Sequence, residues 1–165
     1  MKYTALTSQG KDMKYLCSVL VLLLTTFANP LFGQETPDLV ALIVTLQELE
    51  PTRFKDLTVK KLKKIKSINL EETKVTADIL GSLSQLTSLV TVNLSKTTVS
   101  SDGIKHLAKL TKLAGLEMDG SKVDEHLLSE IAKLPRLKFL FLKNAGLNES
   151  SVNVLSTFKK LSVLD

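Results

Sequence analysis

A sequence period of 24 residues is the feature that most constrains this chain. Five apolar residues begin equivalent segments at this spacing, without insertion or deletion: Leu62, Leu86, Leu110, Leu134 and Phe158. A fixed period of roughly 20 to 29 residues, with apolar residues at set positions, is typical of stacked units of strand and helix. One unit of this size cannot bury its apolar residues alone, so neighbouring units must pack against one another.

Within each segment the apolar residues change their spacing from three to two. In the first segment they are Leu62, Ile65, Ile68 and Leu70, and the following segments repeat these steps. A step of two is typical of a short strand whose alternate side chains face inward. The sequence therefore predicts parallel strands over 67–72, 91–96, 115–120 and 139–144.

A turn and a helix are predicted after each strand. The turn begins with a small residue, whose hydroxyl can bond turn backbone in three of the four segments: Thr73, Thr97, Ser121 and Ala145. Three positions later comes a residue that favours the N-cap of a helix: Thr76, Ser100, Asp124 and Asn148. The predicted fold class is therefore α/β, with parallel strands on one face and short helices on the other.

The run Leu-x-x-Leu-x-x-Leu-x-Leu-x-x-Thr-x-Val-Thr/Ser, continued by a helix, resembles the leucine-rich repeat family. It is similar to the cysteine-containing and ribonuclease-inhibitor-like subtypes, with Thr or Ser where Cys or Asn often stands, and to short secreted bacterial members. The resemblance covers 62–165 and implies a solenoid of four full repeats and a partial fifth, with strands on a concave face. It also implies protein binding along that face, which the spacing itself does not show.

Residues 1–33 are predicted to be a secretory signal peptide. The uncharged run Leu16–Leu24 follows Lys11 and Lys14, and a Pro/Gly break comes after it. The run is too short to span a bilayer comfortably. The signal predicts a secreted, periplasmic or cell-surface protein, and an uncleaved segment that holds the protein in a membrane is the alternative.

Two further expectations concern this N-terminal region. Met13 would give a signal peptide of conventional length, so residues 1–12 are expected to be an over-called gene start. The only cysteine, Cys17, lies in the signal segment, so the mature chain is expected to contain no disulfide.

The two ends of the repeat region need covering, because a solenoid exposes apolar residues there. Residues 34–61 lack the period and predict an N-terminal cap: a helix over the apolar stretch 39–49, then optionally a short strand beside 67–72. A flexible stalk is the alternative. The partial fifth repeat leaves three interpretations open: a fragment of a longer repeat protein, a strand that closes the solenoid, or two copies that stack end to end.

The concave face carries the candidate binding site. Neighbouring parallel strands lie about 4.8 Å apart, so strand residues 24 positions apart form rows of adjacent side chains. Two Phe with charged neighbours form an apolar anchor with a polar rim, as binding hot spots do. The candidate binding residues are Phe139, Phe141, Glu117, Asp119, Lys143, Asn144, Glu71 and Asn93. In the alternative, both Phe pack under further C-terminal repeats or against lysine side chains.

The charge pattern argues against nucleic acid as the partner. The whole chain has a net charge of +5. Its predicted concave face is nevertheless mildly acidic, whereas a phosphate-binding face needs Lys and Arg. A basic cluster over 60–66 is expected to be the solvated side of the first repeat, with anionic lipid or a polyanion as its alternative partner.

No catalytic residue, metal site or cofactor is predicted. His106 and His126 fall at different positions of their repeats, so they form no row of metal ligands. No serine lies in a Gly-x-Ser-x-Gly turn, and no glycine-rich loop could hold a phosphate.

The sequence thus predicts an exported, non-enzymatic module that binds a protein partner of unknown identity through its concave face. Two alternatives stay open. The chain is a recognition fragment of a larger enzyme or effector, or it is a membrane-held surface protein that retains its N-terminal helix. Contact with a membrane is expected only if the signal segment is uncleaved, and end-to-end self-association is a further expectation at the C-terminal end.

Overall fold

The computed structural model describes residues 37–165, so the predicted signal peptide and start codon lie outside the described residues. The helices are α2 (Pro37–Leu49), α3 (Pro51–Phe54), α4 (Val59–Leu62), α5 (Ala77–Leu83), α6 (Ser101–Leu107), α7 (Glu125–Ala132) and α8 (Glu149–Leu155). The strands are β1 (Ser67–Asn69), β2 (Thr91–Asn93), β3 (Gly115–Glu117), β4 (Phe139–Phe141) and β5 (Val163–Leu164).

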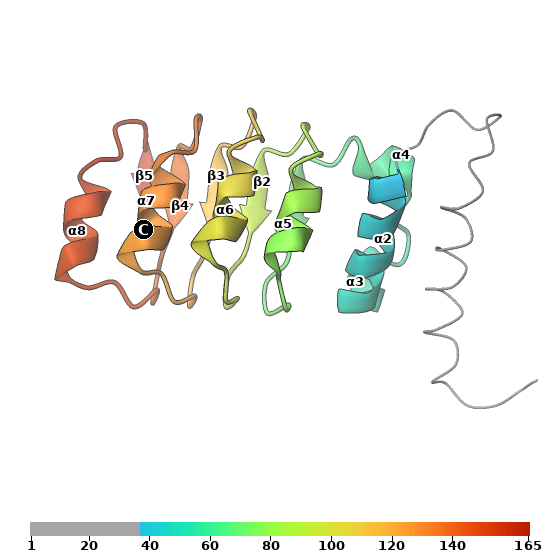
Figure 1. The fold of residues 1–165 in the computed structure, drawn as a ribbon, viewed down its shortest axis with the longest axis horizontal. Coiled ribbons are helices and arrows are strands. Elements are labelled where there is room, and N and C mark those ends of the chain that lie inside the picture. Colours follow the sequence, from blue (N-terminus) through green and yellow to red (C-terminus); the bar gives the residue numbers. More distant parts are fainter. Residues whose placement is uncertain (1–36) are drawn as a thin grey trace, which may run out of the picture.

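The predicted α/β class is confirmed. The five strands form one parallel sheet in the order β1-β2-β3-β4-β5, and a helix follows each of the first four strands. Residues paired between strands are 24 positions apart, as in Ile68 with Val92 and Leu116 with Leu140. Helices α5 to α8 lie in a row over one face of the sheet (Figure 1). The opposite face is called the open face below.

The strands are shorter than the six residues predicted for each. Strand β1 ends at Asn69, although Leu70 N–H still donates to Asn93 O at 2.9 Å and Glu72 N–H to Ser95 O at 3.1 Å. The residue three positions after the end of each of the first four strands has a positive φ, of 55° to 67°: Glu72, Lys96, Gly120 and Asn144. This left-handed conformation turns each chain out of the sheet, and it is unusual for residues other than Gly and Asn.

Each of the helices after a strand begins at its predicted residue. Thr76, Ser100, Asp124 and Asn148 are the N-caps. The side chain of each accepts a hydrogen bond from the backbone N–H three residues later, as Asp124 Oδ1 does from Leu127 at 2.7 Å. The caps satisfy donors that have no partner inside a helix, which fixes the start of α5 to α8.

The core lies between the sheet and the helix row. Leu80, Ile104 and Leu128 occupy the same position in successive helices and are fully buried. The turns below the core use the predicted hydroxyls: Thr73 Oγ1 donates to Leu70 O at 2.7 Å. Ala145 lacks a hydroxyl, and its backbone N–H donates to Leu142 O at 3.0 Å, so this turn keeps its main-chain bond.

The predicted N-terminal cap is helical. Four residues of α2 are buried in the same core as the strands: Leu39, Leu42, Ile43 and Leu46. The optional short strand is wrong: residues 59–62 form α4, and no strand precedes β1 within residues 37–66. Instead, Arg53 Nη1 donates to Asn69 O at 3.2 Å and to Glu71 O at 3.5 Å, so a side chain supplies donors to the outer edge of β1.

Candidate functional site

An apolar patch lies on the open face at the C-terminal end of the sheet. Strand β4 alternates in burial, with Leu140 in the core and Phe139 and Phe141 on the open face. Phe139 is 40% exposed, and Phe141 is half-buried. Phe139 is therefore the accessible member of the predicted pair, while part of the Phe141 ring is covered.

The patch extends beyond the two predicted Phe. Val163 of β5 pairs in register with Phe139 and is 41% exposed. On the other side, Gly115 pairs with Phe139 and carries no side chain. A Cβ at Gly115 would lie 2.9 Å from Thr91 Cγ2, so the Thr91 methyl group already fills this position. Val163 was not predicted, although its place 24 residues after Phe139 could have revealed it.

Charged side chains border this patch. Glu117 pairs in register with Phe141 on the neighbouring strand and is half-buried. Asp119 Oδ1 accepts a hydrogen bond from the Lys143 backbone N–H at 2.8 Å, so one carboxylate oxygen of Asp119 is already used. The side chain of Lys143 is exposed. Glu117, Asp119 and Lys143 thus lie near the two Phe, as predicted.

Two other predicted residues lie away from the patch. Glu71 Oε1 forms an ion pair with Lys96 Nζ at 3.0 Å, and Lys96 also binds Glu72 Oε1 at 2.8 Å. Glu71 is two strands from Asp119, or about 10 Å at the usual strand spacing, whereas Lys96 lies in the neighbouring segment, where its backbone N–H donates to Asp119 O at 2.7 Å. Asn93 pairs in register with Glu117, but its side chain serves the backbone: Asn93 Oδ1 accepts from Ser95 N–H at 2.8 Å.

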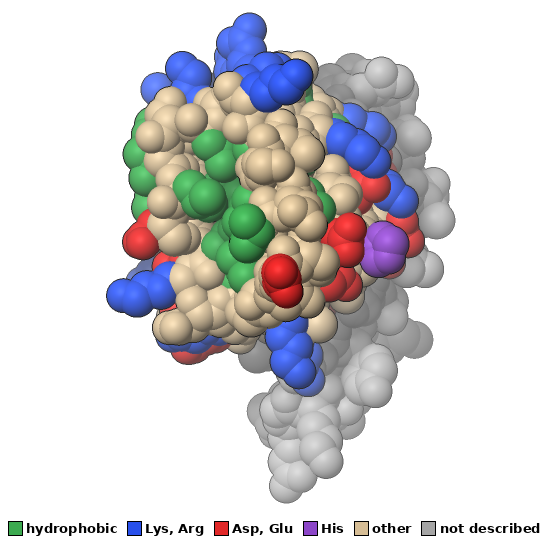
Figure 2. All heavy atoms as spheres, turned by 90° about the vertical axis from the view of Figure 1, so that its left-hand side faces the viewer, with side chains coloured by type: hydrophobic (Ala, Val, Ile, Leu, Met, Phe, Trp, Pro, Cys, Tyr) green, Lys and Arg blue, Asp and Glu red, His purple; other side chains and the backbone are tan. Residues whose placement is uncertain are grey.

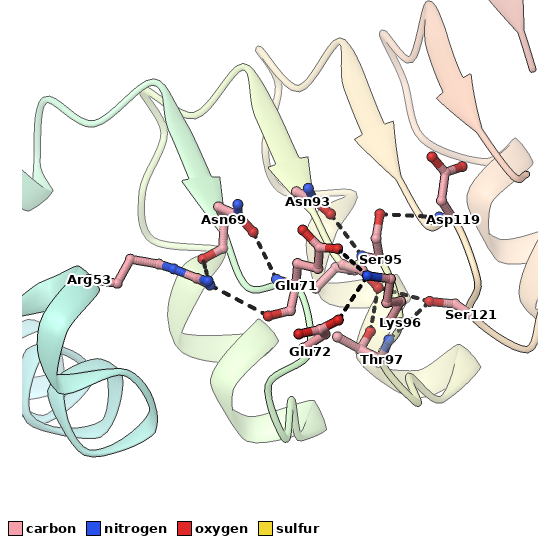
Figure 3. Close-up of polar contacts among 11 residues, drawn as sticks. Arg53, Asn69, Glu71, Glu72, Asn93, Ser95, Lys96, Thr97, Asp119 and Ser121 are labelled. Atoms are coloured by element: carbon pink, nitrogen blue, oxygen red, sulfur yellow. Dashed lines mark hydrogen bonds and ion pairs between the residues drawn. The ribbon is translucent and has the colours of Figure 1, made fainter.

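The polar side chains at the ends of the strands form a connected series (Figure 3). Asn69 Oδ1 accepts from Glu71 N–H at 2.9 Å, as Asn93 does from Ser95. Ser95 Oγ, in turn, accepts from Asp119 N–H at 3.2 Å in the next segment. In the first two segments, the acceptor is the Asn side chain two residues before the donating N–H. In the next two, it belongs to the preceding segment: Ser95 Oγ for Asp119 N–H, and Asp119 Oδ1 for Lys143 N–H. Asn93 and Asp119 are therefore structural acceptors as well as candidate binding residues.

Lys96 lies at the centre of an ion-pair group at the β1–β2 end of the open face. Its hydrogen bond to Glu72 lowers the pKa of that carboxyl below its ordinary value, and the same bond raises the pKa of Lys96. Both side chains are exposed, so solvent and salt screen this attraction. Asn144, the last predicted residue, is exposed and has φ +57°, so its fit to the left-handed turn explains its presence there.

The end of the sheet beyond β4 exposes residues from core positions. Val152 occupies the helix position of Leu128 but is 62% exposed, and Leu164 occupies the strand position of Leu140 but is 48% exposed. Leu147 is 38% exposed in the turn before α8. Figure 2 shows a hydrophobic surface in the middle of this end face, with charged side chains around it. Within residues 37–165 nothing packs over it.

A cavity of about 200 Å³ lies between the residues that end α7 and those that follow α8. Its apolar wall includes Leu134, Leu137 and Phe158, and Lys159 and Lys160 lie at its rim. His106 is half-buried and His126 is exposed, each on its own helix. Among residues 37–165, no three His, Cys, Asp or Glu side chains lie close enough together to hold a metal ion.

Neither the scan against protein-family models nor the search of curated proteins finds a match for this chain. Among the helices of residues 37–165, none has both the length and the apolar character needed to cross a membrane.

Proposed function

We propose that the chain is an exported leucine-rich repeat protein, a solenoid that binds a protein partner through the open face of its sheet and has no enzymatic activity. The 24-residue strand register supports the repeat assignment, together with the four N-caps at equivalent positions. The N-terminal sequence pattern, which lies outside the described residues, supports export.

The observation that carries the binding proposal is the exposure of Phe139 beside Val163. Two large apolar side chains, 40% and 41% exposed, lie in register on neighbouring strands. Partly exposed aromatic side chains with a polar surround gain most from being covered by a partner. Phe139 and Val163 lie on paired strands, so little backbone ordering would be needed on binding.

The border of the patch suggests what the partner offers. Glu117, in register with Phe141, and Asp119 favour a basic side chain next to the apolar residue that covers the two Phe, because opposite charges at a rim guide and orient association. Lys143, which lies beside Asp119, favours an acidic group at the same end of the patch. The expected partner segment therefore combines an aromatic or aliphatic residue with a neighbouring Lys or Arg.

A displayed library of random peptides, selected on the immobilised protein, tests this proposal. Enriched peptides should contain an apolar residue next to Lys or Arg, and Phe139→Ser should abolish their binding. Val44→Ser is the matched control, because Val44 is a half-buried apolar residue of α2, which packs at the β1 end of the sheet, away from Phe139. Peptides that bind the Phe139→Ser variant as tightly as the unchanged protein would contradict a site on the open face.

A second proposal concerns the exposed end face. Leu147, Val152 and Leu164 are apolar, and β5 has a strand neighbour on one side only. An unpaired strand edge beside apolar side chains favours association, and a two-fold pairing of two β5 strands would cover both ends. Light scattering of the chain from residue 34 should then give the mass of a dimer, and Val152→Lys should give a monomer. A monomer at every concentration would refute this self-association.

Export has its own test. Sequencing the N-terminus of the protein recovered from its producing cells should place it near Asn29 or Gln34, after removal of the signal peptide. An intact N-terminus in the membrane fraction would support the alternative, in which the protein stays attached to a membrane.

A further inference from the structure

The charges of this protein are separated between two edges of the sheet. The stretches 59–66, 84–90, 108–114, 132–138 and 156–162 lead into the N-terminal ends of the five strands, and together they are called the basic edge. They contain twelve Lys and Arg and no Asp or Glu: Lys60, Lys61, Lys63, Lys64, Lys66, Lys109, Lys112, Lys133, Arg136, Lys138, Lys159 and Lys160. The remainder of residues 37–165 contains seven Lys and Arg but fifteen Asp and Glu.

These five stretches lie on one side of the molecule because the strands are parallel and in register. All the N-terminal strand ends point to the edge at which α4 lies, the upper edge in Figure 1. Figure 2 shows Lys and Arg side chains along the same upper edge, seen from the end of the sheet. The modest net charge of the chain therefore hides a strongly asymmetric distribution.

The positive charges on the basic edge are available to a partner. All twelve side chains belong to exposed residues. Within residues 37–165 only one of them has a carboxylate partner: Lys133 Nζ lies 2.8 Å from Glu130 Oε1. Lys61 and Lys160 donate to backbone oxygens, which leaves their charge uncompensated. The apolar residues between them, such as Leu62 and Leu110, are fully buried, so the period directs the lysines outward.

The composition of this edge favours an array of phosphates over a base-stacking or bidentate site. Eleven of the twelve residues are Lys, a compact point charge without the planar fork with which Arg grips one anion. The only aromatic residue in these stretches, Phe158, is half-buried against the core. Single-stranded nucleic acid is bound through exposed aromatic side chains that stack on bases. The basic edge offers charge alone.

The path of the chain favours a lipid surface over a soluble polyanion. Helix α2 runs from the side of α4 towards α3, so Pro37 lies on the side of the basic edge (Figure 1). The apolar run Leu16–Leu24 precedes Pro37 by thirteen residues in the sequence. In the membrane-held alternative, in which this run is not cleaved and stays in a bilayer, the chain reaches the folded part on the side where its lysines are.

We propose that the basic edge is a docking surface for an anionic lipid bilayer. Each Lys or Arg near such a surface contributes roughly a factor of five to membrane partitioning, so several together can hold a protein even without an inserted segment. The interaction is electrostatic, and salt should therefore weaken it.

The test measures binding of the full chain to vesicles of phosphatidylcholine alone and to vesicles with about one third phosphatidylglycerol. The apolar run 16–24 can bind vesicles of either composition, so binding to vesicles without anionic lipid measures its contribution. The edge variant is Lys112→Gln/Lys138→Gln. The matched control, Lys74→Gln/Lys122→Gln, removes the same charge from exposed lysines in the turns that follow β1 and β3, at the opposite edge of the sheet.

The edge variant should reduce the preference for anionic vesicles by roughly twenty-fivefold. The control should change it by less than about threefold, because its lysines lie beyond the far ends of the strands, about 20 Å from the docked surface at the usual rise per strand residue, which is more than the screening length. Equal losses in both variants would mean that net charge alone acts, and this would overturn the proposal. An unchanged preference in the edge variant would also overturn it.

A soluble polyanion is separated from a bilayer by competition. Long-chain inorganic polyphosphate is added to the protein on anionic vesicles at rising salt. The phosphate groups of the polyphosphate and those of the anionic lipid are brought to equal concentration. If the vesicles then retain the protein, the bilayer is the preferred partner. If polyphosphate removes the protein completely under this condition, the partner is a soluble polyanion and the proposal fails.

Discussion

Replacing Leu116 by Ala should destabilise the protein far more than the same replacement at Leu164. The two leucines occupy equivalent positions, 48 residues or two periods apart, on β3 and β5. Leu116 is fully buried between the sheet and the helices, whereas Leu164 is 48% exposed. Residue type, strand position and substitution are identical, so burial is the variable that differs.

The expected magnitudes follow from that burial. Truncation of a fully buried Leu to Ala costs about 2–5 kcal/mol, because the transfer free energy of the lost atoms adds to that of a cavity. Leu116 has neighbouring strands on both sides, so the site can collapse little. Leu164 is about half exposed in the folded protein, so its truncation loses only about half of the transfer free energy of a buried Leu. Solvent can also fill the space that the side chain leaves, so the cost should be about 1 kcal/mol.

Urea denaturation followed by circular dichroism measures both changes. The slope of unfolding free energy against urea should stay the same in the two variants, because the surface exposed on unfolding hardly changes. The difference in midpoint then reports the difference in stability. A stack of segments can lose two-state behaviour, so coincident transitions by circular dichroism and by fluorescence of an added probe are needed first.

Equal destabilisation by the two substitutions would refute the reasoning. If Leu164→Ala costs as much as Leu116→Ala, the end of the sheet is covered in solution, and self-association through the end face becomes the explanation. If neither substitution changes the midpoint, the strand register itself is wrong.

Three further predictions concern the surface and the caps. Phe139→Ser should change the unfolding free energy by less than about 1 kcal/mol, while Phe141→Ser should cost more because its ring is half-buried; denaturation of both variants checks this order. Lys96→Met should raise the pKa of Glu72 towards its ordinary value of 4.5, as read by NMR titration. Because that pKa is lowered in the folded protein, its small stabilising effect is present above the ordinary pKa and disappears as the pH falls through the lowered one. Asp124→Ala should cost about 1 kcal/mol through loss of an N-cap, with Asp124→Ser restoring most of it in the same denaturation assay.

The helix starts could be predicted because they depend on local chemistry. Asp124 and Asn148 are strong N-cap residues followed by an acidic residue, and both cap a helix in the structure. The strand register could be predicted because a constant period leaves a single alignment of the apolar residues. Leu116 and Leu140 therefore pair as the spacing requires.

The ends of the strands could not be predicted from periodicity alone. Apolar spacing extends through Leu70 and Met118, but φ becomes positive at Glu72 and Lys96, residue types that seldom adopt this conformation. The equivalent positions of the next two segments hold Gly120 and Asn144, residue types that favour a positive φ, and they could have predicted this turn. Arg53 gave no such signal, because its contact with β1 depends on how α3 packs, which local sequence does not specify.

The candidate site could be predicted only in part. Alternation along β4 placed Phe139 and Phe141 on one face, but alternation cannot give the degree of exposure, which depends on neighbouring strands. Asn93 and Asp119 were predicted to be binding residues, and in the structure both also accept backbone hydrogen bonds. A polar residue at the end of a strand meets unsatisfied backbone donors before it meets a partner, so such positions should be assigned to structure first.

The two proposed surfaces meet at Phe139. Phe139 and Val163 are the first residues of β4 and β5, so they directly follow the stretches 132–138 and 156–162 of the basic edge. A bilayer docked on that edge would therefore cover part of the apolar patch. A peptide selected on the Phe139 patch should bind vesicle-docked protein more weakly than free protein. Equal affinities for docked and free protein would mean that the bilayer does not reach the first residues of the strands, and docking through the basic edge would be wrong.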